Sequence, residues 1–271
     1  SKAGGAVMRP VLSVRHLTVS LREGEGHRAV VDDISFELAE GEVLALVGES
    51  GSGKSKTAEA IMGLVAREAG DVTAEAMVLG DRDLAAMKEP ELQAIRGREI
   101  SMVFQEPLTA LDPVFTCGHQ LATIYRRHRG QGRRDALDSA RAMLTRVGFS
   151  DPDRVLGSYP NKLSGGMRQR VIIAMAMACR PSVLIADEPT TALDVTTQAS
   201  VLSRLVDLGR ETGTAILLIT HDLGIVAHYC DRVLVMREGR IVEDAPVGAL
   251  FDKPAHEYTR SLLAASRGMS T

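Results

Sequence analysis

The stretch Gly48-Glu49-Ser50-Gly51-Ser52-Gly53-Lys54-Ser55 constrains the fold of this chain more than any other feature. It has a glycine, four free positions and then Gly-Lys-Ser, which is the spacing of a phosphate-binding loop. The apolar run 43–47 before it indicates a buried parallel strand, and residues 56–63 after it indicate a helix. Glycines allow backbone N–H groups to surround an anion, and the helix N-terminus adds a positive dipole end. The stretch therefore predicts a strand–loop–helix site for a nucleoside triphosphate, against the simpler interpretation of a glycine- and serine-rich turn.

A second apolar strand, 183–186, ends in two carboxylates and complements this loop. We expect Lys54 to reach the β- and γ-phosphates and the Ser55 hydroxyl to bind Mg²⁺. Asp187 is expected to hold Mg²⁺, directly or through water, and Glu188 to accept a proton from the attacking water. The plainer alternative is that both acids only terminate the strand.

Two further polar residues follow predicted strands. Gln105 comes after 100–104, and His221 comes after 216–220. Because α/β sheets place functional groups at strand ends, we expect His221 to contact the γ-phosphate and Gln105 to contact Mg²⁺ and water. Taken alone, a glutamine or histidine at a strand end is more often an ordinary surface residue. The phosphate-binding loop and the two carboxylates are what favour a functional role for both.

A second anion cradle is predicted at Ser164, Gly165 and Gly166, which precede another helical stretch. Such a cradle is built on the N–H groups of a helix N-terminus. A single phosphate chain has no need of two cradles in one site. We therefore expect this one to serve a nucleotide held by another subunit.

Composition excludes several classes of protein. The net charge of −3 argues against nucleic acid as the main partner, and the basic run 126–134 is expected to be a solvated loop. Cys117, Cys179 and Cys230 form no Cys-x-x-Cys pair, which argues against a zinc or iron–sulfur site and suits a reducing compartment; each is expected to be a small buried apolar residue. No run approaches the roughly 18 apolar residues of a membrane span, and no secretory pattern precedes or follows Met8. A cytosolic protein is expected.

The rest of the chain mixes predicted strands and helices. Strands are expected at 11–21, 29–38, 77–79, 100–104, 182–186 and 215–219, with a hairpin at 233–242. Helices are expected at 89–95, 135–147, 198–210 and 256–265. Between Pro107 and about Arg180 the apolar period is helical rather than alternating, which predicts a helical subdomain inserted into the nucleotide-binding core.

Together these motifs resemble the ATPase subunit of an ABC transporter, in order and spacing and over nearly the whole chain. Gly48–Ser55 is similar to its Walker A motif, Val183–Glu188 to its Walker B motif and Leu163–Gln169 to its signature motif. Gln105 resembles its Q-loop glutamine and His221 its switch histidine. The run Ala192-Leu193-Asp194 is similar to the loop that communicates across the dimer.

The resemblance implies an α/β fold with a RecA-like P-loop core, an antiparallel β subdomain and an inserted α-helical subdomain. Residues 8–271 would form a single domain, with the β subdomain and core at 8–106 and 181–249, the helical subdomain at 107–180, and a C-terminal helix and tail at 250–271. The implied cofactors are ATP and Mg²⁺. The residues expected to contact them are Gly48, Ser50, Gly51, Gly53, Lys54, Ser55, Lys56, His27, Gln105, Asp187, Asp194, Ser164, Gly165 and Gly166.

Finer features resemble the peptide and nickel importer group: the Walker A sequence, the run 104–113, Tyr159-Pro160 and the late run 258–263. Many peptide-importer subunits have a longer, cysteine-containing tail that resembles an iron–sulfur site, and its absence favours the shorter nickel-type members. The family usually stacks an aromatic ring on adenine near Gly26, where this chain has His27 and Arg28. Because base stacking contributes roughly 1–3 kcal/mol, we expect modest nucleotide affinity and loose base selectivity.

The resemblance implies an ATP-hydrolysing importer subunit for oligopeptides, dipeptides or nickel chelates, at the cytoplasmic face of the membrane. The implied partners are a second ATPase subunit (a paralogue or a copy of this chain), two membrane permease subunits and an extracytoplasmic substrate-binding protein. One alternative is a soluble ABC ATPase of DNA repair or translation, although neither a second cassette nor a long coiled-coil insertion is seen. Another is a noncatalytic member of a paired ATPase, against which the intact Glu188, Ser164 and His221 argue.

Overall fold

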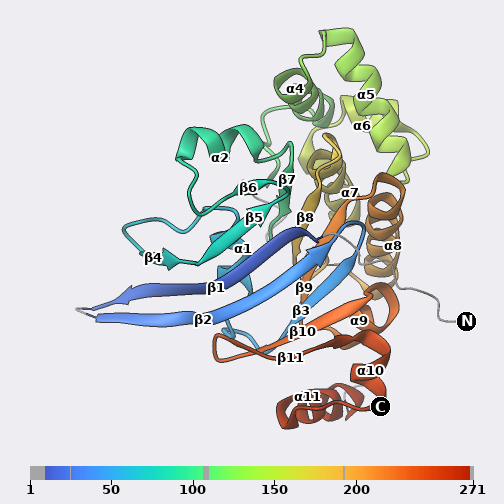
Figure 1. Cartoon of the computed structure of the whole chain (residues 1–271). Helices are drawn as coiled ribbons and strands as arrows, with labels where there is room; N and C mark the ends of the chain where they lie inside the picture. The colour runs from blue at the N-terminus through green and yellow to red at the C-terminus, as the bar shows by residue number, and fades with distance from the viewer. Residues whose placement is uncertain (1–9, 25, 106–109, 192, 269–271) are drawn as a thin grey trace, which may run out of the picture.

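The computed structural model describes residues 10–24, 26–105, 110–191 and 193–268 (Figure 1). Met8, Ala192 and residues 106–109, which follow Gln105, lie outside these ranges. The described chain forms one antiparallel sheet, one mainly parallel sheet and helices that cover them.

The antiparallel sheet comes from the N-terminal part of the chain, as the resemblance implies. Its long hairpin has β1 (Pro10–Glu23) paired with β2 (Gly26–Ala39), and β1 also pairs with β4 (Gly70–Thr73) and β5 (Ala76–Leu79). A short β6 (Arg82–Asp83) extends the sheet beyond β5. Buried and exposed residues alternate along much of β2, as they do in a sheet with one face against a core.

The second sheet has the strand order β11-β10-β3-β9-β8-β7. The pairs β10–β3, β3–β9, β9–β8 and β8–β7 are parallel, and β11 returns antiparallel to β10. The carboxyl ends of these five parallel strands therefore meet at one edge. The bounds are β3 (Val43–Val47), β7 (Ile100–Val103), β8 (Val183–Asp187), β9 (Ala215–Thr220), β10 (Arg232–Arg237) and β11 (Arg240–Pro246).

Helices surround this sheet (Figure 1). Those in the described ranges are α1 (Lys54–Ile61), α2 (Glu89–Ile95), α4 (Cys117–Arg129), α5 (Arg133–Arg146), α6 (Pro152–Gly157), α7 (Gly165–Met177), α8 (Val195–Thr212), α9 (Leu223–Tyr229), α10 (Val247–Asp252) and α11 (Glu257–Gly268), with a 3₁₀ turn at Pro160–Lys162. In the figure α4, α5 and α6 lie at one end of the molecule, and α10 and α11 lie at the other.

Alternate residues of the parallel strands belong to different cores. Leu184 and Leu218 pack with α4, α5, α7 and α8, whereas Ile185 and Leu217 pack with the antiparallel sheet and α1. A third cluster joins β3 and β10 to α9, α10 and α11. The strands are buried on both faces, which is why they read as continuous apolar runs in the sequence.

The interpretation of the basic run 126–134 as a solvated loop is wrong. Residues 126–129 form the last turn of α4, which ends at Gly130 with φ 64°, and Arg133 begins α5. The arginines are exposed, but Leu121 and Tyr125 on the opposite face are buried and hold the helix against the core. Cationic side chains in a last turn also complement the negative end of the helix dipole.

The cysteine expectation is confirmed for two of three residues. Cys117 and Cys179 are buried, whereas Cys230 is only half-buried, and all three are free thiols. Burial raises the pKa of Cys117 to about 11 and that of Cys230 to about 12. These thiols therefore remain protonated at neutral pH and pack as small apolar groups.

Candidate functional site

The stretch Gly48–Ser55 connects β3 to α1, as the sequence predicts. Its glycines are required by the surrounding backbone. Gly53 has φ 108°, and a Cβ at this position would lie 2.4 Å from the Val30 carbonyl oxygen. A Cβ at Gly48 would lie 2.1 Å from the Met236 carbonyl oxygen. Because no L side chain fits either place, β2 and β10 fix the path of the loop from behind.

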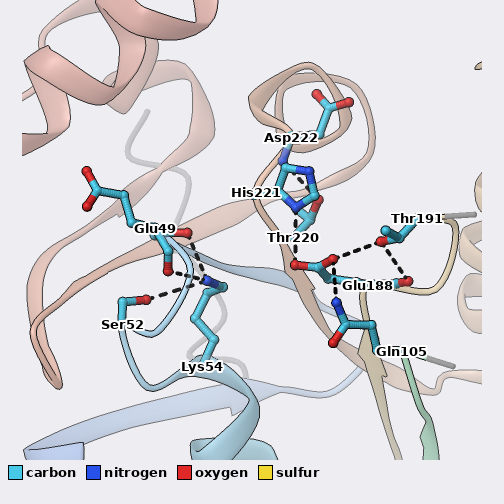
Figure 2. A network of polar contacts seen from close by, with 10 residues as sticks. Glu49, Ser52, Lys54, Gln105, Glu188, Thr191, Thr220, His221 and Asp222 are labelled. Atoms are coloured by element: carbon cyan, nitrogen blue, oxygen red, sulfur yellow. Dashed lines mark hydrogen bonds and ion pairs between the residues drawn. The ribbon is translucent and has the colours of Figure 1, made fainter. Parts of the chain in front are cut away.

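Lys54 lies at the start of α1 and is buried, with 6% of its surface exposed. Its ammonium group donates hydrogen bonds to the carbonyl oxygens of Gly48 and Glu49, both at 2.8 Å (Figure 2). Burial lowers the pKa of Lys54, and the carboxylates of Glu188 and Asp187 oppose this shift. The loop thus holds a desolvated cation whose present partners are neutral carbonyl groups, which a phosphate oxygen would replace with a stronger, charge-assisted bond.

Asp187 is the last residue of β8 and is buried. Burial raises its pKa, and the neighbouring Ser55 hydroxyl opposes that shift. Among the described residues its Oδ1 atom has no hydrogen-bond partner. A buried carboxylate oxygen without a partner, beside a hydroxyl, fits a hard cation such as Mg²⁺, which takes one or two carboxylates and completes its shell with phosphate and water. In the same ranges no cluster of three or more His, Cys, Asp or Glu could hold a metal by itself.

Glu188 is the centre of a polar network (Figure 2). Its Oε2 atom accepts hydrogen bonds from Gln105 Nε2 at 3.1 Å and Thr191 Oγ1 at 2.8 Å, and its Oε1 atom lies 3.1 Å from His221 Nδ1. Burial pushes the pKa of Glu188 upward, but the hydrogen bonds from Thr191 and His221 outweigh it and lower the pKa. Glu188 is therefore ionised at neutral pH.

The backbone brings these groups together from separate strands. Gln105 follows β7, Glu188 follows β8 and His221 follows β9, so the three side chains meet at the carboxyl edge of the sheet. Glu188 has φ 44° and its N–H donates to the Ile219 carbonyl oxygen at 2.9 Å, which turns the residue out of the strand. The structure thus joins Gln105, Glu188 and His221, and places them opposite Lys54 (Figure 2).

Ser164, Gly165 and Gly166 lie elsewhere. Ser164 is the N-cap of α7, and its Oγ accepts a hydrogen bond from the Met167 N–H at 3.3 Å. Asp194 caps α8 in the same way, accepting from the Thr197 N–H. The two caps are neighbours, because a Cβ on Gly166 would lie 2.3 Å from Thr197 Cγ2.

No hydrogen bond or ion pair found within the described ranges links this pair of caps to the phosphate loop.

Other residues expected to bind nucleotide are placed at the rim or away from it. Ser50 and Gly51 line a cavity of about 760 Å³ beside the loop, together with Arg28. His27 Nδ1 instead lies 3.3 Å from Asp71 Oδ2, and both side chains are exposed. Lys56 pairs with Glu59 along α1 at 2.6 Å. Arg28 rather than His27 is thus the neighbour of the loop.

Sequence reasoning missed two residues that contact the motifs. Thr191 reaches Glu188 from three positions downstream, after a turn begun by Pro189, and such a turn could have been suspected from the Pro-Thr-Thr sequence. Tyr258 accepts a hydrogen bond from the Glu49 N–H at 3.2 Å across 209 residues. No local pattern signals a contact of that separation.

A family model described as ABC transporter matches residues 31–191. The chain therefore belongs to the ABC transporter family, and it is an ATPase of that family with a cassette fold. Across the described ranges, no helix combines the length and apolar character that a bilayer crossing requires.

Three similar proteins are ATP-binding proteins of import or transport systems. The chain is 48% identical over 260 residues to a protein of Brucella melitensis biotype 1 named as a peptide import ATP-binding protein, covering 94% of this chain and 77% of that protein. It is 47% identical to the glutathione import ATP-binding protein GsiA of Escherichia coli K12, covering 94% of this chain and 42% of GsiA. It is 48% identical to the peptidoglycan transport ATP-binding protein YejF of Agrobacterium fabrum, covering 95% and 47%.

Solved structures agree with this assignment. One is a dimeric bacterial ABC transporter cassette with a TM-score of 0.77 and 27% identity, covering 87% of this chain and 98% of that one. Another, with a TM-score of 0.77, 26% identity and the same coverage, is a dimeric post-hydrolysis state of an ATP-binding cassette bound to ADP and Pi. The expected P-loop α/β fold is confirmed.

Proposed function

We propose that this chain is the ATP-hydrolysing subunit of an importer, and that it binds MgATP between two cassettes arranged head to tail. The observation that carries the proposal is the meeting of Lys54, Asp187 and the Glu188 network at one edge of the parallel sheet. A buried cation, a carboxylate with one unpartnered oxygen and an ionised, oriented carboxylate are the groups that phosphoryl transfer to water requires.

Lys54 would exchange its bonds to the Gly48 and Glu49 carbonyl groups for bonds to the β- and γ-phosphates. Ser55 and Asp187 would hold Mg²⁺, with Gln105 reaching it from the other side. When bound, Mg²⁺ would neutralise charge on the phosphate oxygens. Each of these residues already lies at the sheet edge where the phosphates would sit.

Glu188 would orient the attacking water and accept its proton. Its lowered pKa keeps it ionised, so that the acceptor form is present at neutral pH. Gln105 and Thr191 hold one carboxylate oxygen, which orients the carboxylate, and His221 faces the other oxygen in the chain without nucleotide. His221 would turn to the γ-phosphate when nucleotide is bound, since 63% of its side chain is exposed.

The second half of the site would come from a partner subunit. Ser164, Gly165 and Gly166 begin a helix of 13 residues, whose N-terminal N–H groups suit a phosphate. Among the described residues, the lack of hydrogen bonds and ion pairs between this cradle and the phosphate loop supports a role in another subunit's site, and the two similar solved cassettes are dimers. Asp194, packed beside the cradle, would act at the same interface. The partner is a paralogue or a second copy.

The helices at 107–180 would form the subdomain that transmits closure to a permease. A groove of about 680 Å³ lies beside Gln105, and its lining includes Leu64, Phe104 and Met175. Leu64 is 40% exposed and Phe104 is 47% exposed. Exposed apolar side chains gathered in a groove favour a protein partner. We propose that a cytoplasmic segment of the permease docks in this groove. The chain would then lie at the cytoplasmic face of the membrane, with a substrate-binding protein on the other side.

Peptides or peptide-like molecules are the proposed cargo. The names of the relatives refer to peptides, glutathione and peptidoglycan, which supports peptides over nickel chelates and an importer over a soluble ATPase of DNA repair or translation. Uptake of labelled dipeptides and of nickel by cells that express the chain with its permease separates these cargoes; nickel uptake alone would contradict the peptide proposal.

The phosphate assignment is tested by calorimetric titration with MgATP. Lys54→Ala should lose binding, because it removes the only cation that the described loop residues direct inward, whereas Lys253→Ala, a change of an exposed lysine at the C-terminal end of α10, should not. Glu188→Gln should keep binding and lower turnover by about 10²–10⁴. Retained affinity in Lys54→Ala would refute the phosphate site, and unchanged turnover in Glu188→Gln would remove this residue from the role of base.

A further inference from the structure

The C-terminal helix α11 touches the phosphate loop through one side chain. The hydroxyl of Tyr258 accepts a hydrogen bond from the Glu49 N–H at 3.2 Å. Tyr258 belongs to the run 258–263, which resembles importer sequences but has no part in the reaction as described above. The contact joins two segments that are 209 residues apart in the chain.

The peptide unit that Tyr258 contacts is also the one that holds Lys54. The Gly48 carbonyl oxygen and the Glu49 N–H belong to the same planar peptide. On one side its oxygen accepts from Lys54 Nζ at 2.8 Å, and on the other its N–H donates to Tyr258. Because the peptide is planar, any rotation that frees the N–H also moves the oxygen that orients the ammonium group.

Tyr258 itself is held firmly. It is 7% exposed and packs in the same cluster as Val47, the last residue of β3, and Leu250. The Arg237 guanidinium lies 5.0 Å from the centre of its ring. Burial raises the pKa of Tyr258, so the hydroxyl remains neutral.

The start of α11 is anchored as well. The Glu243 carboxylate on β11 accepts hydrogen bonds from the Ala255 N–H at 2.8 Å and the His256 N–H at 2.9 Å. The ring is therefore fixed both by the apolar cluster and by the sheet, which makes its hydroxyl a stationary reference point for the loop.

We propose that Tyr258 is a positioning residue for nucleotide binding, acting through the 48–49 peptide to hold Lys54 in place for the phosphates. The proposal rests on the proposed function, since it assumes that Lys54 binds phosphate. It gives the helix α11 a task in the ATP site of its own chain, whereas Ser164 would serve the site of a partner.

A second, independent brace keeps the rest of the loop in place. The Gly239 N–H donates to the Ser52 carbonyl oxygen at 3.0 Å, and the Gly239 carbonyl oxygen accepts from the Asp32 N–H at 2.8 Å. Loss of the Tyr258 hydroxyl should therefore loosen the first turn of the loop without unfolding it. A change in MgATP affinity in a variant without this hydroxyl would therefore report on the position of the loop rather than on unfolding of the chain.

The test is Tyr258→Phe in the full chain, which keeps the ring, its packing and the Arg237 contact. The Kd for MgATP should rise roughly three- to tenfold, the range that the loss of one neutral hydrogen bond gives. The KM for ATP should rise equally while kcat changes by less than about twofold, because Lys54 contacts the phosphates in both ground and transition states. Hydrogen exchange at the Glu49 amide should become faster.

The matched control is Tyr229→Phe, which likewise removes a tyrosine hydroxyl bonded to the backbone, here one that donates to the Ala199 carbonyl oxygen at 3.1 Å. It should leave the Kd for MgATP and exchange at Glu49 unchanged. If Tyr258→Phe binds MgATP as the wild type does, even with a lower unfolding midpoint, the positioning role is wrong. If Lys54→Ala retains binding, the phosphate site itself fails, and the two failures are thereby distinguished.

Discussion

The contact between Gly166 and Thr197 makes a sharp prediction about the cradle at the start of α7. A Cβ on Gly166 would lie 2.3 Å from Thr197 Cγ2, more than 1 Å closer than the ordinary 3.4–4 Å contact. Gly166→Ala must therefore displace the Thr197 side chain or push α7 away from the first turn of α8. Overpacking of this kind costs roughly 1–3 kcal/mol. If that cost falls on the closed dimer, hydrolysis should drop by roughly 5- to 150-fold, at about 1.4 kcal/mol for each factor of ten.

The assay is steady-state ATP hydrolysis with MgATP binding measured beside it. Binding to the single chain should stay near the wild-type value, because the cradle does not contact the loop of its own chain. The double variant Gly166→Ala with Thr197→Ser removes the clashing methyl group and keeps the backbone bond from Thr197 to Asp194. This variant should recover much of the lost hydrolysis.

Three results would count against parts of this account. Wild-type hydrolysis in Gly166→Ala would mean that the cradle is not used, and reduced MgATP affinity of the single chain would mean that it acts within its own subunit. Failure of Thr197→Ser to restore activity would place the defect in the glycine backbone rather than in its packing against α8.

Two further predictions concern the metal-binding carboxylate and the groove. Because burial raises the pKa of Asp187 above its ordinary value of 3.8, the contribution of this one group to stability is greatest below pH 3.8 and is lost as pH rises through its higher folded pKa. Asp187→Asn should therefore resist urea better than the wild type at pH 7 without Mg²⁺, with the difference vanishing below pH 3.8, and should lose Mg²⁺-dependent ATP binding; lower stability at pH 7 would contradict the assigned shift. Phe104→Ser in the groove should keep MgATP binding but lose the stimulation of ATPase by the copurified permease pair, and full stimulation would remove the groove as the docking site.

The strands of the core could be predicted from sequence because they are buried on both faces. The runs at 43–47, 183–186 and 215–219 are apolar without interruption, and each is flanked by polar or turn residues. The sequence pattern therefore predicts that they are strands and where these strands lie in the chain. The loop and the carboxylates follow directly after these strands. For that reason Lys54 and Glu188 could be assigned to one edge of a sheet before its strand order was known.

The ends of helices were less predictable, because charged or polar residues there give a pattern that is also typical of loops. The arginines at 126–129 read as a loop because they are consecutive charges, yet buried Leu121 and Tyr125 carry the helix to Gly130. The predicted start of a helix at 198 was three residues late, because the Asp194 side chain caps α8 from just outside the apolar pattern.

Contacts across the chain could not be predicted. Tyr258 meets Glu49 only because β3, β10 and α11 share one apolar cluster, and the position of α11 depends on the carboxylate of Glu243. His27 was expected near adenine from its place in the chain, but the pairing of β1 with β4 brings Asp71 next to it. Both outcomes depend on strand pairing, which no local sequence pattern specifies.

The central claim is that one complete ATP site takes Lys54 from one chain and Ser164 from another. Mixing Lys54→Ala chains with Ser164→Arg chains tests it directly, since each variant should be inactive alone. In the mixed dimer, one site would combine an intact Lys54 with an intact Ser164. We predict that mixing restores ATP hydrolysis. A mixture that forms dimers but stays as inactive as its components would contradict the composite site.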